Sequence, residues 1–324
     1  MSTSLVHPLK SLAVLPLVNQ SRQAEHEYLC DGLTEEMINA LTQIEGLRVT
    51  SRTSSFFFKN KPIPLLEIGA QLRVSTLLEG SIQVQGNKLR VAVGLIDVQE
   101  DYTFWTETFY RSMEDIFQMQ REISQQIAER LREHMGHLEL TSSLPSVTSP
   151  PVDAYTQYLR SRYHMLKMNE GEIRLGISIL EELQRKVPDY PYVHLGIHMG
   201  YTLLGTLGYM RTGEAFLKGM PHLHKAIELD DSLPECQLQM AWMSFLEEWD
   251  LDATYKHLQA VRNKQPIVDF YQTMTSVLIT ERKYKAAKYH IDIALQMDPF
   301  SKVVNGLFVL FFYVADKASE MMVD

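Results

Sequence analysis

The side chains of this sequence best suited to bind a metal are histidines. His194 and His198 in "YVHLGIHMGY" stand four positions apart, so on a helix both imidazoles would lie on one face. A zinc site needs at least a third protein ligand, and the spacing fixes none. The two histidines of "HLH" at 222–224 would point in different directions on a helix. We therefore expect ordinary packing or surface histidines and predict no metal site.

A run of acidic residues, "EEWDLDATY" at 247–255, is the next candidate for chemistry. Its carboxylates are close together, but it lacks the glycine and the terminal glutamate of a calcium-binding loop. We expect a corner between two helices instead, with Asp250 or Asp252 as the N-cap of the second helix.

The sequence also gives little support for a catalytic nucleophile or a phosphate-binding loop. Cys30 and Cys236 are the two cysteines, and we expect both to be free thiols in separate domains, with Cys30 buried and inert. The loop from Asn19 to Cys30 contains no glycine, so its amides are not suited to converge on an anion, and we interpret it as a connector. No GxSxG, HExxH, P-loop, GxGxxG, kinase-type or cyclase-type signature occurs. We predict no catalytic residues, no cofactor and no enzyme activity for this segment.

Bulk charge and hydropathy exclude two further classes of function. The chain has 324 residues with 31 Lys+Arg against 40 Asp+Glu, a net charge of −9, and no visible basic patch for nucleic acid. The N-terminal stretch lacks the basic and apolar regions of a signal peptide. The apolar stretch 303–315 is shorter than the ~20 residues of a spanning helix, so we expect it to be buried in a helical array. The composition favours the cytoplasm, with the periplasm open if a membrane anchor precedes the segment.

Hydrophobic patterns predict an α+β domain over residues 8–137. We expect strands at 12–18 and 47–52, a helix starting at Asp31 or Thr34, and a second helix at 65–73. Strict alternation on both sides of Gly86-Asn87 predicts a hairpin, followed by a third antiparallel strand at 102–111. Ser112 and Asp115 would then cap a long helix. The predicted order is β-α-β-α-β-β-β-α, a mixed sheet covered by helices, and the buried stripe of the last helix would be Ile116, Ile123, Ile127 and Leu131.

Four stretches of this domain carry a family resemblance: "LAVLPLVNQS", "EYLCDGLTEEMINALTQIEGLRVTSRTSSFFFKNK", "IGAQLRVSTLLEGSIQVQGNKLRVAVGLIDV" and "DIFQMQREISQQIAERL". They resemble the TolB amino-terminal-like, or FlgO-like, domain of bacterial regulatory proteins. The resemblance implies a neighbouring array of tetratricopeptide (TPR) repeats and an effector. That effector would be a winged-helix (CadC-like) or other DNA-binding domain, or an adenylate/guanylate cyclase. The resemblance supplies no active-site residues.

The C-terminal part reads as TPR repeats. After a Ser/Thr/Pro-rich linker at 138–152, small residues recur at Gly176, Gly219, Ala253 and Ala287, spaced by 43, 34 and 34 positions. Seven positions after each stand Leu183, Ala226, Ala260 and Ala294. We predict an all-α TPR solenoid over 153–324, about four and a half repeats, with an insertion near 203–215.

Counting a further 34 positions from Ala287 leads to Met321. We therefore expect the chain to stop inside the second helix of a fifth repeat, with further repeats beyond Asp324. The alternative is a natural end that packs on a partner.

The concave face of such an array is lined by the first helix of each pair and binds peptides or helices. A protein partner would be held there, although Trp242 and Phe245 could instead pack between repeats. The register places these residues on that face: Glu235, Leu238, Trp242, Phe245, Asp269, Gln272 and Ser276. A homo-oligomer is left open.

Taken together, these features predict a non-catalytic sensory and protein-interaction segment of a bacterial regulatory protein, with the effector outside it. The alternative is a free-standing scaffold or envelope-assembly protein without an effector. A third possibility is a piece of an adenylate/guanylate cyclase whose catalytic domain is absent here.

Overall fold

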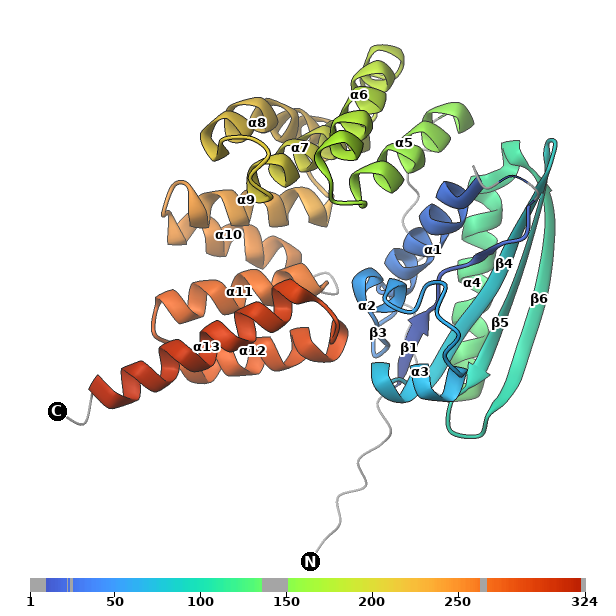
Figure 1. Cartoon of the computed structure of the whole chain (residues 1–324), viewed down its shortest axis with the longest axis horizontal. Coiled ribbons are helices and arrows are strands. Elements are labelled where there is room, and N and C mark those ends of the chain that lie inside the picture. The colour runs from blue at the N-terminus through green and yellow to red at the C-terminus, as the bar shows by residue number, and fades with distance from the viewer. Residues whose placement is uncertain (1–9, 22, 24–25, 136–150, 263–266, 322–324) are drawn as a thin grey trace, which may run out of the picture.

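The computed structural model describes residues 10–21, 23, 26–135, 151–262 and 267–321 (Figure 1). The predicted linker at 138–152 lies almost wholly outside the described residues. An α+β domain is followed by an array of helices, and the two lie side by side.

The first domain is built on one mixed sheet with the order β3-β1-β4-β5-β6, and β2 pairs with β4 beyond β1. Strands β1 and β3 and strands β1 and β4 run parallel, whereas β4, β5 and β6 form an antiparallel meander. The predicted hairpin is confirmed, with Val84 opposite Leu89 and a positive φ of 60° at Gly86. The strands are β1 (Ser11–Val14), β2 (Val18–Asn19), β3 (Arg48–Val49), β4 (Thr76–Gln85), β5 (Lys88–Asp97) and β6 (Tyr102–Ser112).

Helices cover both faces of this sheet, and the alternation in β1 shows how. Leu12 and Val14 pack with α1 and α4 on one face, whereas Ala13 and Leu15 pack with α3 on the other. The predicted stripe of α4 is confirmed as fully buried. The helices are α1 (Glu27–Leu41), α2 (Arg52–Phe56), α3 (Leu65–Leu72) and α4 (Ile116–Met135), the last preceded by a 3₁₀ turn, η2 (Met113–Asp115).

The predicted element order was wrong in two places, because the structure adds the short strand β2 and the short helix α2. The first helix also begins earlier than predicted, at Glu27, so that Asp31 and Thr34 lie inside it and are buried. Thr34 Oγ1 accepts a hydrogen bond from Leu17 N at 3.0 Å and ties the loop to the helix. At the other end of the sheet, Ser112 donates to the Asp115 carboxylate at 2.7 Å but does not cap α4 itself.

The rest of the chain consists of helices that pack as consecutive hairpins. In the described part, α5–α6, α7–α8, α9–α10 and α11–α12 form such pairs, and α13 packs on α11 and α12. The helices are α5 (Val152–Met165), α6 (Glu170–Lys186), α7 (Pro191–Thr206), α8 (Thr212–Leu229), α9 (Pro234–Leu246), α10 (Leu251–Arg262), α11 (Val268–Thr280), α12 (Tyr284–Met297) and α13 (Lys302–Met321).

The predicted repeat register is right for Gly176, Gly219 and Ala287 but one residue off in α10. A Cβ on Gly176 would lie 2.9 Å from the Ser161 carbonyl of α5, which explains why a small residue is needed at this crossing. In α10 the fully buried residues are Thr254, Leu258 and Val261, whereas Ala260 is exposed. The reason is local, since Asp250 caps α10 and shifts its inward face by one position.

Two further predictions about the array need correction. The expected insertion near 203–215 is not a long loop, because α7 and α8 are 16 and 18 residues long and absorb most of it. Met321 ends α13, a single 20-residue helix, and does not lie in a second helix of a fifth repeat. Apart from Gly306, α13 contains no glycine or proline that would favour a turn.

The register of α10 can be tested by stability. We expect Val261→Ala to lower the free energy of unfolding by about 2 kcal/mol, because it removes a fully buried side chain. The matched variant Ala260→Ser, on the exposed side of the same helix, should change it by less than about 0.5 kcal/mol. Urea unfolding followed by circular dichroism measures both, and equal losses would contradict the shifted register.

Candidate functional site: the concave face of the repeat array

The predicted concave-face residues divide into two groups. Leu238 and Phe245 are only 3% and 5% exposed, so they pack between helices and do not line a groove. Trp242 is partly buried against Phe245, with ring centroids 6.2 Å apart. For these three aromatic and aliphatic side chains the structure favours packing between repeats.

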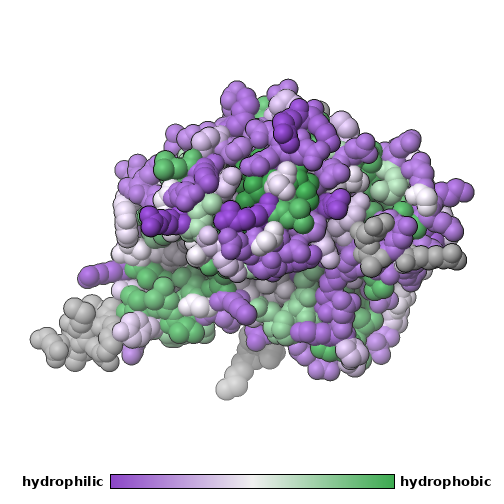
Figure 2. Space-filling view, turned by 45° about the horizontal axis from the view of Figure 1, so that its top comes forward, coloured by the Kyte–Doolittle hydropathy of each residue, from purple (hydrophilic) through white to green (hydrophobic). Residues whose placement is uncertain are grey.

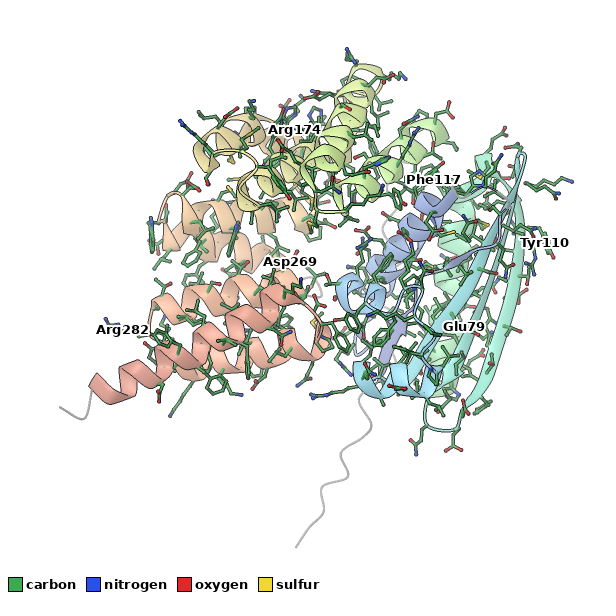
Figure 3. All side chains as sticks on the ribbon, in the orientation of Figure 1. Glu79, Tyr110, Phe117, Arg174, Asp269 and Arg282 are labelled. Carbon is green, nitrogen blue, oxygen red and sulfur yellow. The ribbon has the colours of Figure 1, made fainter. Side chains whose placement is uncertain are left out.

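The polar members of the predicted set remain accessible. Asp269 is solvent-exposed and lies at the end of α11 that faces the first domain (Figure 3). Gln272 and Ser276 are partly exposed on the same helix, and Ser276 Oγ donates to the Gln272 carbonyl at 3.1 Å. Glu235 is partly buried at the start of α9 and acts electrostatically on Asp269. The accessible part of the predicted site is therefore acidic.

Helices α5 and α7 contribute side chains to this face that the repeat pattern did not predict. Tyr158 and Arg162 of α5 lie in the same electrostatic neighbourhood as Glu235 and Glu36, and Tyr190 and Tyr192 pack beside Tyr158. A signal was present in the sequence, because Tyr155, Tyr158 and Arg162 follow one face of a helix.

The first domain faces this surface through α1. Glu35 of α1 forms ion pairs with Arg162 of α5 and with Arg52 of α2, the latter at 3.3 Å. All three side chains are mostly buried, so each charge depends on the others for compensation. Burial alone would lower the pKa of Arg162, but the surrounding carboxylates of Glu35 and Glu36 hold it raised.

Glu36, the next residue of α1, is held in an environment that favours its protonated form. Burial raises its pKa to about 7, and Glu35 adds to the shift while Arg162 opposes it. Its Oε2 accepts a hydrogen bond from Gln120 Nε2 at 3.3 Å, and Tyr155 of α5 donates to Gln120 Oε1 at 3.2 Å. This chain of contacts joins α1, α4 and α5.

Asp269 shows the same behaviour on the opposite side of the concave face. Although solvent reaches it, the surrounding protein raises its pKa to about 6, with Asp298 and Glu235 adding to the shift and Arg162 opposing it. Carboxylates from α1, α9 and α11 thus act on one another across the space between the first domain and the array.

The far end of the array docks on α2 of the first domain. Ser54 donates to the buried Asp298 carboxylate at 2.6 Å and accepts from Phe300 N at 2.9 Å, and Phe57 stacks on Phe300 with centroids 4.2 Å apart. Ser51 N donates to the Met297 carbonyl at 2.8 Å. We call Ser51, Ser54, Phe57, Asp298 and Phe300 the α2 junction.

The histidines and cysteines of the sequence analysis have structural roles. His194 donates through Nε2 to the Pro188 carbonyl at 2.8 Å, and His198 donates through Nε2 to Gln239 Oε1 at 3.3 Å. Within the described ranges, no group of three or more metal-ligating side chains could hold an ion. Cys30 and Cys236 are buried, and burial raises the pKa of each thiol to about 12, so neither is a ready nucleophile.

The prediction that 303–315 is buried was only half right. Val304 and Phe311 are buried, but the opposite face of α13 exposes Val303, Val309 and Tyr313 to about two-thirds of their surface. Figure 2 shows hydrophobic side chains gathered toward this end of the molecule. Among the helices of the described residues, none is both long and apolar enough to cross a membrane.

Two comparisons find sequence similarity between this chain and known proteins. Residues 9–128 match the family model described as HilA/YgeH-like transcriptional regulator, second domain. This match covers less than half of the chain. The "Putative adenylate cyclase 3" of Rhizobium meliloti (strain 1021) is 29% identical over 249 residues, which is 74% of this chain and 41% of that protein. The chain thus spans about two-fifths of the length of this relative. Both similarities fit a regulator that carries helical repeats.

Solved structures give weaker similarities. A thermophilic TPR protein of Thermus thermophilus, TTC0263, aligns at a TM-score of 0.40 and 13% identity, covering 62% of this chain and 94% of its own. A PelC dodecamer from Paraburkholderia phytofirmans aligns at 0.23 and 16%, covering 35% of this chain and 78% of its own. At these TM-scores neither neighbour supports a further statement. None of the matches above names the TolB amino-terminal-like family, so that assignment stays a prediction.

The pKa shift of Glu36 predicts a pH dependence of stability. Its pKa in the folded state is about 7 against an ordinary 4.5, so its stabilising contribution is complete below about pH 4.5 and is lost as the pH rises through 7. We expect Glu36→Gln to be more stable than the wild type at pH 8, by at most about 3 kcal/mol because solvent screens a partly buried group. At pH 5 the difference should fall below about 1 kcal/mol.

Urea midpoints at pH 5, 6, 7 and 8 measure this difference. The exposed Glu45→Gln, on the loop after α1, serves as the matched control and should follow the wild type. A Glu36→Gln curve parallel to the wild-type curve over this range would contradict the assignment.

Proposed function

We propose that this chain is a non-catalytic sensory and protein-interaction segment of a bacterial regulator, and that an effector outside these residues produces the output. The observation that carries the proposal is the docking of the first domain at two places on the array. Ion pairs of Glu35 hold α5, and the α2 junction holds the α12–α13 turn. A ligand or partner that changes the conformation of one domain would therefore also change the other domain through these contacts.

The regulator-like match of residues 9–128 supports the proposal from an independent direction. In this account the first domain, whose TolB-like or FlgO-like nature is part of the proposal, perceives a signal. The helical hairpins form a TPR solenoid that recruits a protein partner. Asp269, Gln272, Ser276 and Glu235 are the proposed contacts, because they are the accessible members of the predicted face.

A second candidate function comes from the Rhizobium meliloti relative. That protein is named as a putative adenylate cyclase, and the similarity covers 74% of this chain. The chain would then be the regulatory segment of a nucleotide cyclase. A free-standing scaffold without an effector is the third proposal, and it predicts no output of either kind.

The α2 junction allows these functions to be separated in the native host. We expect the chromosomal double variant Phe57→Ala with Phe300→Ala to change the transcript profile, because loss of the stacked pair, worth about 0.5–1.5 kcal/mol, weakens the docking. Transcript sequencing and cellular cyclic AMP are measured together, with the amount of the protein checked by immunoblot.

Tyr289→Ala is the matched control, since it removes an aromatic ring that is 63% exposed on α12. Changed transcripts at constant cyclic AMP would support the transcriptional regulator, and changed cyclic AMP would support the cyclase. If the double variant and the control both match the wild type at equal protein levels, the regulatory proposal is wrong.

A further inference from the structure

A pocket of about 510 Å³ lies where the first domain meets the end of α12. From the first domain it is lined by residues at the starts of β1, β3 and β4 and at the ends of α3 and β5, and Gln296 of α12 completes it. This volume lies within the range of small-molecule sites in proteins. The lining residues are Ser11, Arg48, Arg73, Val74, Ser75, Val98, Gln99 and Gln296.

The charged groups in this lining are both cationic. Arg48 donates through its two terminal nitrogens to the carbonyls of Gln296 and Arg73, and its Nε is buried without a hydrogen-bond partner in the described structure. Burial, with the neighbouring Arg73 adding to it, lowers the pKa of Arg48. Arg73 itself is exposed at the end of α3, where its backbone adopts a left-handed conformation with φ of 54°.

No carboxylate forms an ion pair with Arg48 or Arg73 among the residues that the structure describes. Placing two guanidinium groups beside each other, one of them partly buried, is costly unless an anion compensates them. The chain as a whole is acidic, so a general excess of positive charge does not explain this arrangement. Guanidinium groups bind phosphate and carboxylate groups with paired hydrogen bonds.

We propose that this pocket binds the oxyanion of a small metabolite, a phosphate or carboxylate group held between Arg48 and Arg73. The serine hydroxyls and Gln99 in the lining add neutral polar surface for the rest of such a ligand. Because Arg48 also holds the Gln296 carbonyl, the ligand would sit on the contact between the first domain and the array. Binding would therefore strengthen that contact. Anion binding is measured on the purified chain, so its test is independent of the test of the proposed regulatory function.

Thermal unfolding of the purified chain tests this site. Inorganic phosphate, pyrophosphate and citrate are titrated at constant ionic strength set with sodium chloride. We expect at least one of them to raise Tm by a few degrees in a saturable manner, as a ligand of the folded state does. A response to phosphate and pyrophosphate but not citrate identifies a phosphate group, and a response to citrate alone identifies carboxylates.

Arg73→Gln should raise the dissociation constant of the anion that raises Tm by about tenfold or more, because it removes one of the two positive charges of the pocket. Arg282→Gln is the matched control, because Arg282 is also an exposed arginine in a left-handed conformation, with φ of 59°. It lies in the turn between α11 and α12, on the side of the array away from the first domain (Figure 3). This variant should respond like the wild type. Absence of a saturable shift with all three anions, or an equal shift in Arg73→Gln, would overturn the site, since excluded anions stabilise every variant alike.

Discussion

One carboxylate, that of Glu35, lies at the centre of the charged contact between the two domains. It pairs with Arg52 of α2 and Arg162 of α5, so one side chain of α1 connects the first domain to the beginning of the array. Removing Glu35 would leave the mostly buried guanidinium groups of Arg52 and Arg162 without this partner, which generally costs several kcal/mol. The α2 junction makes the second attachment, at the far end of the described array. Between these two points the helical hairpins are held with their concave side toward α1 (Figure 1).

This arrangement changes what the concave face can do. In an isolated repeat array, that face is open to any peptide with complementary groups. Here part of it is already occupied by α1, and neighbouring carboxylates help to raise the pKa values of both Glu36 and Asp269 above their ordinary values. A partner would thus have to compensate this acidic surface or displace the first domain.

Local patterns allowed much of the fold to be predicted. The hairpin at Gly86 and the stripe of α4 follow from alternation and helical period, which neighbouring residues alone determine. The one-residue error at Thr254 arose because a step of 34 positions from Gly219 was assumed, whereas the cap at Asp250 sets the start of α10. In the concave site, the accessible residues of α11 were predicted, but Leu238 belongs to the interior.

The contacts between the domains could not be predicted from the sequence. Ser54 and Phe300 are 246 positions apart, and no local sequence pattern around either residue predicts their contact. The same holds for Glu35 and Arg162, which are separated by 127 positions. Such pairs depend on the path of every helix between them, which a periodic pattern does not determine. The stripe of Tyr155, Tyr158 and Arg162 was visible, but only the position of α1 shows what it contacts.

The central claim, that the first domain holds the array at both ends, is tested most directly by a distance measurement across the two domains. Spin labels at Glu79 on β4 and Arg282 between α11 and α12 occupy exposed positions on opposite sides of the molecule (Figure 3). Pulsed electron–electron double resonance on the frozen protein measures the distribution of distances between the two spin labels. The account predicts one narrow distribution centred on the distance in this structure. A broad distribution, or one that contains longer distances in most molecules, would contradict it.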